Sequence, residues 1–387
     1  MMAKIEYAKA IGKPIDGHAP GLQGDDLSTY INAGITTDHE AYSYEEGLEK
    51  IAKGMKILIR EGSAAKNYEA LSRLIDEYPN SCMFCSDDKH PDDLVQGHIN
   101  SLVKRSIELG YDLFNILQVA CINPIEHYNL DIGKLQVGDR ADFIIVDNLR
   151  EFNLIESYID GACVFRDNQL LVGSVASQAI NNFNAPFKDM DDFKLPFQEG
   201  LIRVIKAIEH ELITKEVDEE PKVEDRYVVA DVERDILKIA VVNRYRDAEV
   251  VVDFIEGFGL QQGAIASSIA HDSHNIIAIG CDDESIAKAV NLVIENQGAI
   301  VAVGDDEELI LPLDIAGLMS SQEGERVAKK YKLINKFVKD SLGSRLDAPF
   351  MTLSFMALLV IPELKLSDKG LFDSQHFAFT DIFCAKI

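Results

Sequence analysis

The sequence predicts an α/β protein in which part of a (β/α) barrel is followed by a separate α+β domain. Two observations indicate this fold class. Short apolar segments alternate with amphipathic segments from residue 2 to residue 86, a rhythm typical of parallel strands joined by crossover helices. A His or an Asp follows several of the apolar segments, and (β/α) barrels carry their chemistry at the C-terminal ends of their strands.

The elements of the first section follow from hydrophobic periodicity and from helix end signals. We expect helices at residues 2–11, 25–32, 45–54, 68–78, 91–110 and 112–120, and strands at residues 13–16, 34–37, 55–60 and 81–86. A Gly-Asp-Arg turn at residues 138–140 precedes a β-branched run, which is typical of a hairpin. It predicts a small β module that includes residues 143–147, 156–165 and 169–172.

Four parts are predicted along the chain: a partial barrel at residues 1–130, a small β module at 131–174, a connection at 175–194 and an α+β domain at 195–387. The connection is rich in Asn, Ser, Asp and Pro. In the α+β domain we expect a strand or helix at 201–209, strands within 236–258 and 264–280, a helix at 283–296, strands at 299–303 and 309–312, and a long charged helix at 320–342.

Composition excludes two classes of partner. The 387 residues carry a formal net charge of -27, whereas nucleic-acid binding requires clustered Lys and Arg; we therefore expect no nucleic-acid partner. The apolar runs are short and interrupted by charge, which argues against a membrane partner, and the N-terminus lacks the pattern of a secretory signal. We expect a cytoplasmic protein.

Three polar side chains at predicted strand ends are the candidate site residues. His18 and His39 follow two consecutive strands of the alternating series, and Asp87 follows a later one. His18 or His39 alone is more simply explained as a surface or capping residue, whereas Asp87 comes too early to fit well as a cap of the helix that follows it. Neighbouring barrel strands bring their C-terminal ends within metal-ligand reach, however. The pattern predicts that His18, His39 and Asp87 hold a metal, with Asp87 also accepting a proton from bound water.

Four motifs in order, DGHAPG, TTDHE, CSDDKHPDDL and HDSHN, resemble those of the bacterial adenine deaminases of the amidohydrolase superfamily. The resemblance runs over nearly the whole chain. It implies the C-terminal half of a metal-dependent (β/α)8 amidohydrolase barrel, strands five to eight, and the hydrolysis of adenine to hypoxanthine and ammonia in purine catabolism or salvage. By the same resemblance, His18 and His39 match the metal ligands of strands five and six, and Asp87 matches the carboxylate of strand eight that ligates metal and shuttles protons.

The resemblance also implies cofactors and partners. The cofactor is a divalent metal, with Mn or Fe favoured over Zn, and the substrate is adenine. Family members begin with a β module and four barrel strands that supply a His-x-His pair and a Glu, so the sequence looks like the C-terminal part of such an enzyme. We expect weak activity from this chain alone and recovery with a complementary N-terminal chain. Open strand edges predict association into a homo-oligomer.

His271 and His274 belong to the HDSHN motif. A hydrogen-bonded turn explains them without any function, whereas the resemblance implies a lid on the substrate side of the active site. Two other functions stay open at this point: a non-catalytic remnant that acts as an oligomerisation or regulatory partner, and another cyclic amidohydrolase. The second is not expected to carry both TTDHE and HDSHN.

Overall fold

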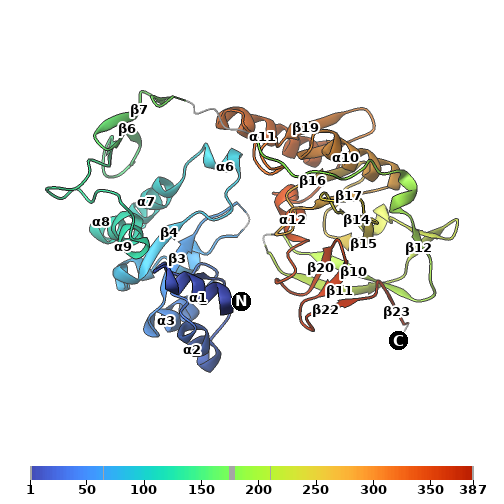
Figure 1. Ribbon diagram of the computed structural model, residues 1–387, viewed down its shortest axis with the longest axis horizontal. Coiled ribbons are helices and arrows are strands. Elements are labelled where there is room, and N and C mark those ends of the chain that lie inside the picture. Colours follow the sequence, from blue (N-terminus) through green and yellow to red (C-terminus); the bar gives the residue numbers. More distant parts are fainter. Residues whose placement is uncertain (1, 64, 174–178, 210, 386–387) are drawn as a thin grey trace. The chain divides into compact units, whose positions relative to one another are not determined.

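The computed structural model describes residues 2–63, 65–173, 179–209 and 211–385. The chain divides into two compact units (Figure 1): unit 1 comprises residues 1–89 and 96–176, and unit 2 comprises residues 90–95 and 177–387. The predicted connection at 175–194 includes residues 175–178, which lie outside the described part. No helix within the described residues is long and apolar enough to span a bilayer.

Unit 1 begins with a four-stranded parallel sheet in the order β1-β2-β3-β4. Its strands are β1 (Asp16–Gly17), β2 (Thr37–Asp38), β3 (Lys56–Arg60) and β4 (Cys82–Cys85). Helices α1 (Met2–Ala10), α2 (Gly24–Asn32), α3 (Tyr44–Ala52), α4 (Tyr68–Leu71) and α5 (Leu74–Glu77) alternate with the strands. The predicted alternation is confirmed, although the predicted helix 68–78 is two short helices.

The core of this sheet explains the alternation. Ile57, Ile59 and Phe84 from the strands pack with Leu71 and Leu74 from the crossover helices, and all five are buried. Each crossover must return its apolar face to the sheet, which is why adjacent strands run in parallel. The C-terminal ends of the strands therefore meet along one edge.

The predicted helix 91–110 is wrong as a single element. It is divided into α6 (Pro91–Leu94) and α7 (Ile99–Glu108), which belong to different units. Gly97 lies between them with a positive φ, which interrupts the helical backbone. The predicted helix 112–120 is α8 (Leu113–Leu117), which continues through a π-helical turn (Gln118–Ile122) into α9 (Asn123–Tyr128).

The rest of unit 1 contains a small antiparallel sheet in the order β5-β6-β7-β8. Its strands are β5 (Phe143–Val146), β6 (Leu154–Ile159), β7 (Ala162–Arg166) and β8 (Gln169–Leu170), close to the predicted module. Many of its apolar side chains are exposed, among them Ile144, Ile155 and Leu170.

Unit 2 is built on a nine-stranded mixed sheet in the order β11-β10-β15-β14-β17-β16-β18-β19, with β23 also paired to β10. These strands are β10 (Leu201–Ala207), β11 (Thr214–Glu219), β14 (Leu237–Val242), β15 (Val251–Glu256), β16 (Ala264–Ser267), β17 (Ile276–Gly280), β18 (Ala299–Val303), β19 (Glu308–Pro312) and β23 (Phe383–Cys384). Residues 201–209 were expected to form either a strand or a helix, and the structure has strand β10 there. The strands predicted within 236–258, 264–280 and at 299–303 and 309–312 are confirmed.

Helices and two small sheets complete unit 2. The helices are α10 (Asp283–Glu295), α11 (Gly324–Asp340) and α12 (Pro349–Phe355), which confirms the predicted helices at 283–296 and 320–342 with shifts at their ends. One small sheet joins β9 (Leu195–Pro196), β12 (Lys222–Glu224) and β13 (Tyr227–Val229), and the other joins β20 (Leu364–Ser367), β21 (Gly370–Asp373) and β22 (Ala378–Thr380). Small residues such as Ala264 and Ala278 let α10 approach the sheet closely.

Candidate metal centre

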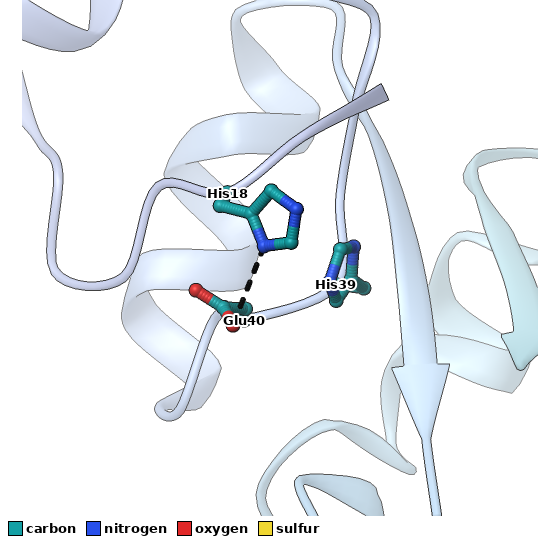
Figure 2. A group of neighbouring side chains, drawn as sticks. All are labelled: His18, His39 and Glu40. Carbon is teal, nitrogen blue, oxygen red and sulfur yellow. Dashed lines mark ion pairs between the residues drawn. The ribbon is translucent and has the colours of Figure 1, made fainter. Parts of the chain in front are cut away.

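Two imidazoles meet at the C-terminal edge of the parallel sheet. Gly17 of β1 pairs with Asp38 of β2, and the next residue on each strand is a histidine. The ring centroids of His18 and His39 lie 4.4 Å apart with an interplanar angle of 76° (Figure 2). The structure thus brings together two of the three predicted site residues.

Glu40 is the third member of this group. Its Oε1 lies 3.5 Å from His18 Nδ1 (Figure 2), and His18, His39 and Glu40 each offer one ligand atom, all within 4.8 Å of one another. The other carboxylate oxygen, Oε2, is buried without a hydrogen-bond partner among the described residues. An unpartnered buried carboxylate oxygen is costly, and a cation between the three side chains would satisfy it. The residues present therefore fit a divalent metal.

The two histidines have opposite electrostatic environments. The hydrogen bond with Glu40 raises the pKa of His18 above its ordinary value, whereas burial lowers the pKa of His39. Burial acts to raise the pKa of Glu40, but the hydrogen bond with His18 and the charges of His18, Arg60 and His39 together outweigh it, so the pKa lies below its usual value. Glu40 is therefore ionised near neutral pH, as a metal ligand must be.

The backbone beside both histidines is fixed by side chains of neighbouring elements. The Tyr30 hydroxyl accepts a hydrogen bond from the His18 N–H at 3.1 Å, and a Cβ at Gly17 would collide with that hydroxyl, which explains the Gly of the DGH sequence. The Asn67 amide donates to the carbonyls of His39 and Ala41 at 3.1 and 3.0 Å. Both ligand positions are therefore held before any ion binds.

Asp87 lies just past the end of β4 but outside the group formed by His18, His39 and Glu40. Its Oδ2 is 2.6 Å from Nη1 of Arg60, and the same Nη1 is 3.6 Å from Oε1 of Glu40. Its charge nevertheless acts to raise the pKa of both histidines. Asp87 is thus connected to the group through Arg60, and its predicted role as a metal ligand stays a prediction.

Glu40 and Arg60 are the site residues that the sequence prediction missed. Glu40 was visible as a carboxylate next to the strand-end His39 in TTDHE, and Arg60 as a charged residue at the end of the apolar strand 55–60. A charged side chain at the end of a buried strand needs an oppositely charged partner. The position of Arg60 at such a strand end therefore indicated that nearby carboxylates, such as Glu40, could pair with it.

His271 and His274 lie in unit 2, in the loop between β16 and β17. The His271 ring stacks on Phe355 with centroids 4.8 Å apart, and the backbone N–H of His271 donates to the Ser354 carbonyl at 3.1 Å. The N–H of His274 donates to the Ala270 carbonyl at 2.6 Å, so the loop is a hydrogen-bonded turn. A lid role for these residues stays a prediction.

Comparison with known proteins assigns a class to this arrangement. Residues 1–173 match the model of the amidohydrolase family, in agreement with an α/β fold that carries histidines at strand ends. Residues 211–378 match the model of the adenine deaminase C-terminal domain. The chain belongs to the adenine deaminase family.

Several curated relatives support this membership. Adenine deaminase of Sulfurovum sp. (strain NBC37-1) is 55% identical over 98% of this chain and 70% of its own length. The relatives from Methanosarcina acetivorans and Borreliella burgdorferi are 53% and 46% identical over 100% and 98% of this chain, and over 72% and 70% of their own lengths. Two solved structures of β-aspartyl dipeptidase from Fervidobacterium islandicum AW-1 align with TM-scores of 0.36 and 0.37 at 18% and 20% identity, over 45% of this chain and 53% and 52% of theirs.

Proposed function

We propose that this chain is a hydrolytic enzyme that converts adenine to hypoxanthine and ammonia in purine catabolism or salvage. The observation that carries the proposal is the group of His18, His39 and Glu40 at adjacent strand ends, in a chain 55% identical to an adenine deaminase. The relatives cited above are all adenine deaminases, which favours this reading over a non-catalytic partner and over another cyclic amidohydrolase.

The cofactor is a divalent metal held by His18, His39 and Glu40, with Asp87 as a further proposed ligand. Mixed imidazole and carboxylate ligation suits Mn, Fe and Zn, and the family resemblance supports Mn or Fe. When bound, such an ion lowers the pKa of a coordinated water and so supplies a nucleophilic hydroxide.

The reaction needs one proton relay, for which Asp87 is the candidate. Water adds to C6 of adenine, the C6–N bond breaks, and ammonia leaves while the ring keeps a carbonyl. Asp87 would take one proton of the attacking water and deliver it to the departing amine, and the second proton of that water ends on N1 of the product ring. Arg60 keeps the Asp87 carboxylate beside the site through the 2.6 Å ion pair.

We also propose that the parallel sheet is one half of a (β/α)8 barrel, corresponding to strands five to eight. Within the described residues, β1 and β4 are its outer strands, and the sheet β5–β8 exposes Ile144, Ile155 and Leu170. Open edges and exposed apolar faces favour association. A complementary N-terminal chain is the proposed partner, and a homo-oligomer is a second proposal.

Two further predictions complete the functional assignment. His271 and His274 are proposed to contribute to a lid on the substrate side; Nδ1 of His274 is buried and has no hydrogen-bond partner among the described residues, which supports a polar ligand there. A cytoplasmic location is also proposed, in line with the similarity of the chain to adenine deaminases.

Ammonia release from adenine tests the function. The chain is purified with added Mn or Fe and assayed alone and with the N-terminal segment of the Sulfurovum relative. We expect weak release from the chain alone, stronger release with the segment, and a fall to background in both arms for His39→Ala. Absence of release in both arms would contradict the proposed function.

A further inference from the structure

A buried ammonium lies behind the two histidines. Lys50 of α3 has no exposed surface on its side chain, and its Nζ donates to the Ala19 carbonyl at 2.5 Å, to Asp38 Oδ2 at 2.8 Å and to Glu46 Oε1 at 2.5 Å. Ala19 directly follows His18, and Asp38 directly precedes His39. The single ammonium therefore contacts both segments that carry the imidazoles.

The two carboxylates bound by Lys50 also join these segments. Oδ1 of Asp38 accepts the N–H of Ala19 at 3.0 Å and the N–H of Glu40 at 3.2 Å. The oxygens of Glu46 accept the N–H of Gly21 at 2.7 Å and the N–H of Tyr42 at 3.1 Å. Each carboxylate thus connects the segment 18–21 to the segment 38–42, and the three groups form one buried network.

Burial makes this network sensitive to the loss of any member. The side chains of Asp38 and Lys50 are 0% exposed and that of Glu46 is 1% exposed. Without Lys50, two carboxylates would remain next to each other in a dry environment, and one buried charge without its partner is strongly unfavourable. The hydrogen bonds that join the network to the segments 18–21 and 38–42 go to backbone groups next to the histidines, so the network would act on the metal centre mainly through the position of the backbone.

We propose that Lys50 is a positioning residue for the metal centre, which it maintains by fixing the segments 18–21 and 38–42 against each other through Asp38 and Glu46. The proposal rests on the proposed metal site. Groups that orient metal ligands typically alter affinity 10- to 100-fold when they are removed.

The sign of the effect separates positioning from electrostatics. Lys50→Met removes a positive charge close to the centre, and the loss of its Coulomb repulsion would by itself tighten the binding of a cation. Positioning predicts the opposite. We expect Lys50→Met to weaken Mn binding by at least about tenfold, measured by electron paramagnetic resonance of free Mn.

Lys53→Met is the matched control. Lys53 lies three residues further along, its side chain is 29% exposed, and it pairs with Glu49 at 3.2 Å, away from the two ligand segments. We expect it to bind Mn like the unaltered chain. Unchanged or tighter Mn binding by Lys50→Met would overturn the proposal.

Amide hydrogen exchange without metal provides an independent measurement. The N–H groups of Ala19, Gly21, Glu40 and Tyr42 should exchange faster in Lys50→Met and at the original rate in Lys53→Met. If Lys50→Met does not fold, Glu46→Gln serves instead, with faster exchange expected at Gly21 and Tyr42. Unaltered exchange would overturn the proposal, whereas failure of the unaltered chain to bind Mn would overturn the metal site and with it the proposed function.

Discussion

His18 and His39 lie next to each other, yet their surroundings shift the pKa values of the two imidazoles in opposite directions. His18 has a side chain that is 69% exposed and hydrogen-bonds to Glu40, so its protonated form is favoured. His39 is more buried, and desolvation favours its neutral form. Because metal binding requires neutral imidazoles, His39 is the better prepared ligand, and Glu40 must exchange its contact with His18 for the ion.

The Glu40 Oε2 atom, which is buried and lacks a hydrogen-bond partner in the described part of the chain, leads to a prediction at this site. Glu40→Gln keeps the shape of the side chain but replaces a ligating oxygen with an amide and removes its charge. We expect Mn affinity to fall at least about tenfold, measured by isothermal titration. Glu45→Gln is the control because Glu45 is an exposed carboxylate five residues further along, in the first turn of α3. Equal affinities for the two variants would remove Glu40 from the ligand set.

A second prediction concerns a lysine in unit 2 that is unrelated to the metal centre. Lys365 is fully buried, its Nζ donates to the Leu212 carbonyl at 2.7 Å, and burial lowers the pKa of its ammonium to about 7. The unfolded chain keeps the proton up to the ordinary pKa of lysine, about 10.4. Between pH 7 and pH 10 the unfolded state therefore binds more protons, and the free energy of unfolding should rise with pH.

Lys365→Met should remove this pH dependence. We expect the variant to be more stable than the unaltered chain at pH 7, with the difference shrinking toward pH 10, in urea unfolding at several pH values. Lys332→Met, at an exposed position of α11, is the control and should follow the unaltered chain. If the stability curves of Lys365→Met and the unaltered chain stay parallel across this range, the low pKa is wrong.

The sequence predicted the two histidines of the site but not how the carboxylates are distributed. His18 and His39 were found because each ends a strand in an alternating series. Asp87 was predicted from the same rule, and the structure pairs it with Arg60. Glu40 was missed since sequence spacing does not show which of several adjacent carboxylates turns toward the imidazoles. Lys50 was missed because a lysine within an amphipathic helix normally faces solvent.

At the level of elements, the contact between α10 and the large sheet depends on small residues. Gly280 ends β17, and a Cβ there would lie 2.6 Å from Ile286 Cγ1 and 2.8 Å from Ala264 Cβ. We expect Gly280→Ala to destabilise the chain by about 1–3 kcal/mol because the helix must move outward. Urea unfolding measures this change in the free energy of unfolding.

Gly324→Ala provides the matched control for that prediction. Gly324 begins α11, and a Cβ there would meet nothing within 4 Å. Since alanine favours helix over glycine by up to about 1 kcal/mol, this variant should be unchanged or more stable. Equal destabilisation by both substitutions would contradict the close packing between α10 and the sheet.

Most elements were predictable from periodicity, and the failures have local causes. Strands β3, β4 and β18 and helix α10 have strong patterns and were found with small shifts at their ends. The helix expected at 91–110 was predicted because the apolar periodicity continues across Gly97. In the structure the helix is interrupted at Gly97, and the residues before it form α6, which packs on α11. A short window of sequence cannot show whether such a segment continues as one helix or breaks so that its first residues pack against a helix that is distant in the sequence.

For the whole molecule, the division into two units predicts a selective effect of metal. The candidate ligands His18, His39 and Glu40 all belong to unit 1. A ligand at 100 times its Kd stabilises the state it binds by about 2.7 kcal/mol. Calorimetry with Mn should therefore raise the unfolding transition of unit 1 and leave that of unit 2 in place.

His39→Ala is the reference for that calorimetric experiment and should show no shift with Mn. A rise in the transition of unit 2, or an equal rise in His39→Ala, would place the bound metal elsewhere. Because the net charge is -27, we expect some weak Mn binding on the surface of both proteins. The difference in the shift between the unaltered chain and His39→Ala is therefore the quantity that tests the prediction.

The alternation of strands and helices predicted the fold class, whereas the prediction of the reaction depended on the four motifs and their order along the chain. Strand-end histidines are shared by many hydrolytic sites and do not select adenine by themselves. The membership of the chain in the adenine deaminase family then agrees with the motifs along nearly its whole length. The assignment of residues 90–95 to unit 2 depends on contacts between residues far apart in the sequence, which periodicity does not report.

A single metal ion between His18, His39 and Glu40 is the basis of the proposed chemistry. Anomalous X-ray scattering from crystals grown with Mn would locate this ion, with data collected on both sides of the Mn absorption edge. We expect a single strong anomalous peak enclosed by the two imidazoles and the Glu40 carboxylate, absent from crystals of His39→Ala. A peak bound by other residues, with none between His18 and His39, would contradict it.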